Sequence, residues 1–145
     1  MVRKVTPQDK EMYLSLTEKF YQSDAVSHNI PLENRLNTWD EIMRSDEYAD
    51  CYFVIKDGAV AGYMLLAYTF SQEAGGKTAW IEEIYILPEF RSQGLGSEFF
   101  EFIKSEIEPV CARLRLEVEE DNIRAKKLYA SLGFKPLEYE QMIRE

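Results

Sequence analysis

One stretch of the sequence constrains the fold more than any other, an apolar, β-branched segment that passes through a glycine turn into an amphipathic segment. The apolar segment begins at Trp80 and ends at Leu87-Pro88, the turn is Arg91-Ser92-Gln93-Gly94-Leu95-Gly96, and the amphipathic segment reaches Ile107. This order predicts a strand, a tight turn and a helix. The free N–H groups at such a helix start lie at the positive end of the helix dipole and bind anions, most often phosphate. The glycines by themselves would also suit a turn that binds nothing. The nearby Arg91 favours an anion site.

The residues before this stretch predict antiparallel strands. Apolar runs at 51–56 and 59–70 flank Asp57-Gly58, which is a strong hairpin signal. A second loop with two glycines, residues 71–77, leads into the apolar segment, so three successive strands are expected to pair antiparallel. A further short strand is expected at 2–5.

The residues after the stretch predict a crossover connection. Leu114, Leu116 and Val118 alternate with charged residues, as in a half-buried strand. Because a full helix separates this strand from the apolar segment, the two are expected to run parallel. Asn122 is a suitable cap for one more helix, which stops at Gly133. Residues 134–137 and 139–143 are predicted to form the last strand or strands.

Two helices are expected near the N-terminus. Thr6-Pro7 is a helix start, and a second helical repeat covers residues 32–45. The first helix has an apolar residue at every fourth position: Met12, Leu16 and Phe20. The 145 residues suit one domain with a single core. The order of elements predicts an α/β fold with a mixed, mostly antiparallel sheet that contains a parallel βαβ pair and is covered by helices.

Charge and composition exclude several classes of function. A net charge of −9 argues against binding nucleic acid and favours a cationic partner or substrate. His28 lies among polar loop residues, and Cys51 and Cys111 are far apart and expected to be reduced, so neither a metal site nor a catalytic triad is predicted. No apolar run would span a bilayer and the N-terminus lacks a signal-peptide core, so a cytoplasmic protein with no membrane partner is expected.

The glycine turn and a later segment together resemble the GNAT superfamily of N-acetyltransferases, which use acetyl-coenzyme A. The turn matches the family pattern Arg/Gln-x-x-Gly-x-Gly/Ala, and Asn122, Leu128-Tyr129 and Gly133-Phe134 match a second family pattern. Either pattern alone is weak, whereas both at this separation and on the expected elements are specific. Ile81-Glu82-Glu83-Ile84-Tyr85-Ile86 is most similar to the diamine and polyamine acetyltransferases. The part before Ala49 is matched only by element order.

The resemblance implies a site for acetyl-coenzyme A. Its pyrophosphate would lie on the N–H groups of residues 93–97, with Arg91 either adding charge or lying free on the surface. Its pantetheine arm would pair with the backbone where the Trp80 and Leu114 strands splay apart. The residues implied in cofactor binding are Ile84, Ile86, Arg91, Ser92, Gln93, Gly94, Leu95, Gly96, Ser97, Asn122 and Tyr129. Ser92 stands where the polyamine group usually has glycine, and a negative φ would accommodate it.

Two side chains are predicted to be catalytic. Tyr129, matched to the family tyrosine, is the candidate general acid, although a tyrosine on an amphipathic helix is ordinarily a packing residue. Glu82 matches the base of the polyamine enzymes, and strand alternation places it on the face of Ile84 and Ile86. The same alternation sends Glu83 to the opposite face. An ion pair with a lysine or arginine is the alternative role for Glu82.

The resemblance therefore implies an acyltransferase that moves an acetyl group to a primary amine by direct attack in a ternary complex. The acidic composition and the Glu82-Glu83 pair favour a small cationic amine. Acetylation of protein or peptide amines and a non-catalytic acyl-coenzyme A-binding module are the alternatives. Trp39, Tyr68 and the 71–77 loop are expected to face the acceptor, and a homodimer is expected from the family alone.

Overall fold

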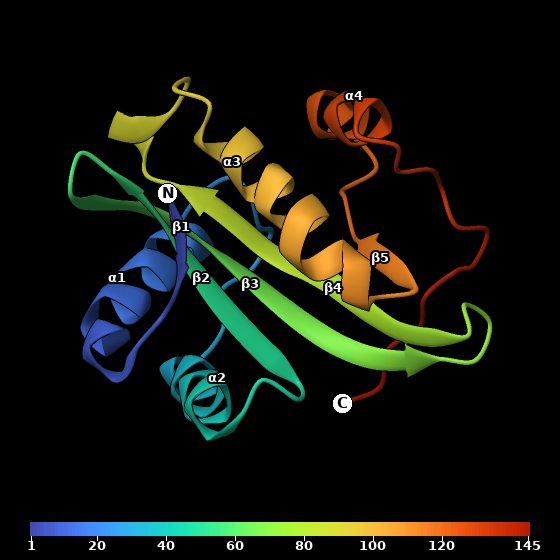
Figure 1. Ribbon diagram of the computed structural model, residues 1–145, viewed down its shortest axis with the longest axis horizontal. Helices are drawn as coiled ribbons and strands as arrows, with labels where there is room; N and C mark the ends of the chain where they lie inside the picture. The colour runs from blue at the N-terminus through green and yellow to red at the C-terminus, as the bar shows by residue number, and fades with distance from the viewer.

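The computed structural model describes residues 1–145 and is built on one five-stranded sheet with strand order β1-β2-β3-β4-β5 (Figure 1). The strands are β1 (Val2–Lys4), β2 (Ala49–Lys56), β3 (Ala59–Ser71), β4 (Gly76–Ile86) and β5 (Arg113–Leu116). The first four pair antiparallel, and β5 runs parallel to β4. Both predicted hairpins and the predicted parallel pair are therefore confirmed.

Helices cover both faces of the sheet (Figure 1). The helices are α1 (Lys10–Tyr21), α2 (Leu32–Arg44), α3 (Leu95–Phe102) and α4 (Ile123–Ser131). α3 continues through a π-helical turn, Ile103–Ile107, into the 3₁₀ turn Glu108–Val110, where proline stops the helix. None of the helices combines the length and apolar character that a bilayer crossing would need.

Two apolar cores flank the sheet. Tyr13 and Phe20 of α1 and Trp39 of α2 pack on one face, and Phe99 of α3 packs on the other. The apolar stripe predicted for α1 was wrong at one position, because Met12 is 40% exposed and Tyr13 is the buried residue. Trp39 belongs to the core, so it does not face the acceptor as expected.

A β-bulge in β4 separates the two parallel strands. Leu65 lies opposite Glu83 and Leu66 opposite Ile81, which leaves Glu82 as the extra residue. A bulge bends its strand and increases the local twist. β5 accordingly pairs with β4 only as far as Ile81, where its partner is Leu116. The strand predicted through residue 118 therefore ends two residues earlier, and the edge of β4 beyond Ile81 is left without a neighbour.

The final strands predicted at 134–137 and 139–143 are not formed, because no regular element follows α4. Pro136 has no N–H to donate to a ladder, which weakens the first of these segments. Side-chain hydrogen bonds connect the segment after α4 to the rest of the protein instead. The Tyr139 hydroxyl donates to Glu73 at 3.0 Å, and the Gln141 amide donates to Glu117 at 3.2 Å. The outer edge of β5 is therefore left unpaired.

Candidate active site

A groove of about 850 Å³ runs along the glycine turn, with α3, α4 and the free edge of β4 as its walls. Of the residues implied in cofactor binding, all but Gln93 and Asn122 line it. Gly94 is the residue before α3 and has φ +79°, a conformation that suits glycine. A Cβ on Gly96 would have no atom within 4 Å, so the backbone here faces open space. The N–H groups of the helix start are therefore accessible to a ligand.

Ser92 departs from the expectation at this turn. Its φ is +61°, in the left-handed region, whereas a negative φ was expected to accommodate the serine. This conformation costs a residue with a Cβ about 1–2 kcal/mol. The turn keeps its shape with this strain, and glycine would adopt the same conformation without it.

We expect Ser92→Gly to raise the free energy of unfolding by about 0.5 kcal/mol, because relief of left-handed strain exceeds the added entropy of glycine in the unfolded chain. Urea unfolding measures the change. Ser105→Gly is the matched control, because Ser105 lies in the π-helical turn with an ordinary φ and should lose about 0.5–1 kcal/mol. Equal destabilisation of both variants would contradict the prediction.

The free edge of β4 presents backbone groups to the groove. The Leu87 N–H donates to Ala61 of β3, so this group faces the sheet. The Ile86 carbonyl faces the other way and accepts a 2.9 Å hydrogen bond from Arg91 Nε. Along a strand, the backbone N–H and C=O groups of successive residues face opposite edges. The backbone groups of Ile84 therefore face the same edge as those of Ile86. Arg91 is thus an exposed side chain whose Nε–H is hydrogen-bonded to a backbone carbonyl of this edge.

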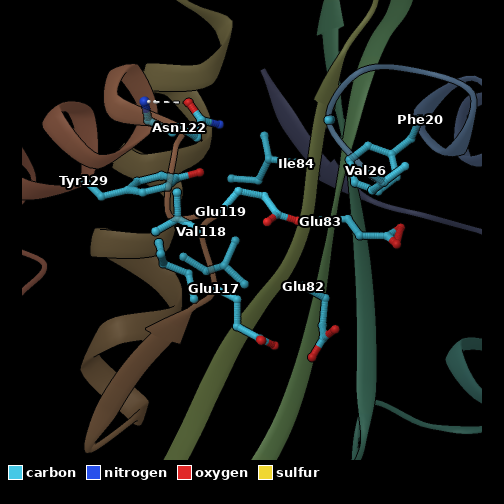
Figure 2. Close-up of a pocket in the computed structure, with 14 residues that line it drawn as sticks. Phe20, Val26, Glu82, Glu83, Ile84, Glu117, Val118, Glu119, Asn122 and Tyr129 are labelled. Carbon is cyan, nitrogen blue, oxygen red and sulfur yellow. Dashed lines mark hydrogen bonds between the residues drawn. The ribbon is translucent and has the colours of Figure 1, made fainter. Parts of the chain in front are cut away.

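A second, acidic pocket of about 350 Å³ adjoins the groove (Figure 2). Glu82 and Glu83 reach it from β4, and Glu117 and Glu119 reach it from the segment after β5. Val26, from the loop between α1 and α2, also lines it. Sequence reasoning missed Glu117, Glu119 and Val26. The acidic residues around Val118 were a visible signal, but nothing local indicated that the loop returns here. Neither Tyr68 nor the 71–77 loop lines this pocket.

The two adjacent glutamates have different surroundings. Glu83 is buried and accepts hydrogen bonds from the hydroxyls of Tyr21 at 2.7 Å and Tyr63 at 2.8 Å. Burial raises the pKa of Glu83, and these hydrogen bonds offset part of the rise. Glu82 makes no ion pair, so its alternative role as the partner of a lysine or arginine is not observed. Desolvation, together with the charges of Glu117 and Glu83, raises the pKa of Glu82, which makes it a stronger base than an ordinary glutamate.

Tyr129 is oriented by aromatic packing. Its ring centroid lies 6.2 Å from that of Phe100 and 6.1 Å from that of Phe134. Figure 2 shows its hydroxyl pointing toward Ile84, and this hydroxyl has no hydrogen-bond partner within the protein. Burial raises the pKa of Tyr129, so the hydroxyl stays protonated near neutral pH. Asn122 lines the acidic pocket, and its side chain caps α4 by accepting from the Ala125 N–H at 3.1 Å.

Ile84 and Tyr129 line both the groove and the acidic pocket, so the two cavities meet at these residues. One cavity has the helix start and free strand edge that suit a long anionic ligand, and the other is lined by carboxylates that suit a cation. Two such adjoining cavities suit a protein that holds an anionic and a cationic ligand side by side. Residues 10–134 match the model of the acetyltransferase (GNAT) family, and the chain belongs to that family.

Individual relatives agree with the family assignment. Bovine (Bos taurus) thialysine N-ε-acetyltransferase is 37% identical over 79 residues, which are 54% of this chain and 46% of that protein. The chain thus spans about half the length of this curated relative. A putative ribosomal protein bS18-alanine N-acetyltransferase of Bacillus subtilis (strain 168) is 30% identical over 132 residues, covering 88% of this chain and 80% of that protein. The structure of AAC(6')-Iy with the bisubstrate analogue CoA-S-monomethyl-acetylneamine has a TM-score of 0.79 at 17% identity, covering 100% of this chain and 97% of that one.

Proposed function

We propose that the protein transfers the acetyl group of acetyl-coenzyme A to the primary amine of a small cationic molecule. The observation that carries this proposal is the junction of the two cavities at Ile84 and Tyr129. A thioester at the end of the groove would meet an amine bound in the acidic pocket at this point. Family membership and the coenzyme A conjugate bound by the structural neighbour support the choice of acyl donor.

The groove residues fit coenzyme A. Gly94 and Gly96 leave the N–H groups of the α3 start accessible to a pyrophosphate. The free edge at Ile84 offers backbone groups to the amides of a pantetheine arm. Leu128 and Leu132 of α4 are 50% and 43% exposed and line the same groove, which suits the apolar parts of the ligand.

Two side chains each transfer one proton in the reaction. The neutral amine attacks the thioester carbonyl carbon, so a C–N bond forms and the C–S bond breaks. Glu82 takes the proton that the amine loses, directly or through a water molecule, and its raised pKa favours this step. Tyr129 donates its hydroxyl proton to the departing thiolate. A backbone N–H at the Ile84 edge stabilises the charge that develops on the carbonyl oxygen.

The acidic pocket supports a cationic acceptor. Four glutamates and no lysine or arginine line it. Its volume of about 350 Å³ lies at the small end of ligand sites, which favours a small molecule over a peptide. The name of the Bacillus subtilis relative favours a protein amine as the second candidate. A homodimer and a cytoplasmic location stay predictions from the sequence.

We expect short diamines to be acetylated with a higher kcat/KM than monoamines of similar length, because the second charge is attracted by the glutamates of the pocket. Raising the salt concentration should lower kcat/KM for the diamines, since screening acts over about 10 Å at 0.1 M. Thiol release from acetyl-coenzyme A with a panel of amines measures both effects. A kcat/KM for diamines that does not change with salt concentration would contradict a small cationic acceptor. Preference for a peptide amine over every small amine would contradict it as well. Coenzyme A binding without thiol release would identify a binding module instead.

A further inference from the structure

We infer that Lys104 and Arg124 bind the phosphate on the 3′ carbon of the coenzyme A ribose and select coenzyme A over its 3′-dephospho form. The inference rests on the proposed acyl donor and names residues that sequence reasoning missed. Lys104 lies in the π-helical turn that continues α3, and Arg124 lies in the first turn of α4. Both line the groove, from its two helical walls, and neither makes an ion pair.

The charge of the groove is opposite to that of the rest of the protein. The chain has a net charge of −9, yet three cations and one acidic residue line the groove: Arg91, Lys104, Arg124 and Glu101. Arg91 donates its Nε–H to the Ile86 carbonyl and packs on the Tyr85 ring, with 5.5 Å between its guanidinium carbon and the ring centroid. Lys104 and Arg124 therefore remain as the cations with no partner in the protein.

Their position suits a second anionic group on the ligand, apart from the one at the helix start. Ser97, Glu101 and Lys104 follow one another at helical spacing along the groove wall, so Lys104 lies roughly 10 Å from the Gly96 end of the helix. An anion bound on the N–H groups of the helix start is satisfied there and lies away from Lys104. Coenzyme A has two separate anionic groups, the pyrophosphate and the 3′-phosphate. The pyrophosphate suits the helix start, which leaves the 3′-phosphate for the two cations.

Calorimetric titration of the intact chain with coenzyme A and with 3′-dephospho-coenzyme A tests the inference without any turnover. The unaltered protein should bind coenzyme A about 10- to 100-fold more tightly, as two charge-assisted contacts allow. Lys104→Ala and Arg124→Ala should each weaken coenzyme A binding by about 3- to 10-fold and leave 3′-dephospho-coenzyme A binding unchanged. The double variant should bind the two nucleotides equally.

Lys127→Ala is the matched control, because Lys127 is an exposed cation of α4 that does not line the groove, and it should leave both affinities unchanged. Equal affinity of the unaltered protein for the two nucleotides would overturn this inference and leave the proposed function standing. Equal weakening of both nucleotides in the Lys104 and Arg124 variants would overturn it as well, since the cations would then act on the shared pyrophosphate. Failure of the unaltered protein to bind either nucleotide would overturn the proposed function together with the inference.

Discussion

Replacing Tyr129 by phenylalanine is expected to lower kcat by about 10- to 1,000-fold and to change acetyl-coenzyme A affinity little. The hydroxyl is the only group that the variant removes. The ring would stay between Phe100 and Phe134, because their contacts are made by its aromatic carbons. Loss of the general acid then slows departure of the thiolate without altering the groove. Steady-state kinetics with the best diamine, together with calorimetry of coenzyme A binding, separate the two effects.

Tyr48→Phe is the control for this variant, since Tyr48 is 58% exposed, makes no hydrogen bond through its hydroxyl and lines neither cavity. An unchanged kcat in Tyr129→Phe would remove the hydroxyl from the mechanism. Ping-pong kinetics or an acetylated cysteine during turnover would contradict direct attack. Cys51 is poorly suited to that role, because burial raises the pKa of its thiol well above the usual range.

Replacing Gly96 by valine is expected to weaken acetyl-coenzyme A binding by about 100-fold or more with the fold intact. The valine side chain would project into the groove, because a Cβ at this position meets no protein atom within 4 Å. It would keep a pyrophosphate away from the N–H groups of the helix start. Valine has a helix propensity no worse than that of glycine, so the melting temperature should not fall. Calorimetry and thermal unfolding measure the two quantities.

Ala130→Val is the matched control, because Ala130 is an exposed residue of α4 that lines neither cavity. It introduces the same side chain into a helix and should leave binding unchanged. Unaltered affinity in a folded Gly96→Val protein would mean that the phosphates lie elsewhere. Gly94 is less suitable for the test, since its φ of +79° would add backbone strain to any steric effect.

Features encoded by neighbouring residues could be predicted from the sequence. Asp57-Gly58 predicts a hairpin because glycine and aspartate adopt positive φ readily, and both residues do so here. The pattern from Trp80 to Ile107 predicted the strand, the turn and the helix that line the groove. The capping role of Asn122 was likewise correct, since a cap bonds to its own helix. In each case the decisive interaction lies within a few residues.

The tertiary structure decided the features that depend on distant partners. The bulge at Glu82 exists only in the pairing with Leu65 and Leu66, and it is the bulge that ends β5 early and opens the edge of β4. The C-terminal segments predicted as strands do not join the sheet, and the outer edge of β5 stays unpaired.

The acidic pocket was decided in the same way. The Glu83 carboxylate accepts hydrogen bonds from Tyr21 and Tyr63, which are 62 and 20 residues away along the chain. Burial in this contact, rather than the identity of the residue, determines which glutamate is enclosed and which stays exposed to an acceptor. The sequence by itself therefore determined the glycine turn between strand and helix, because that depends on local pattern, and the resemblance to the family supplied Tyr129 and Glu82 as candidate catalytic residues. Only the folded chain decided that Tyr129 lies at the junction of the two cavities and that Glu82 lines the acidic one, because both depend on how the sheet bends.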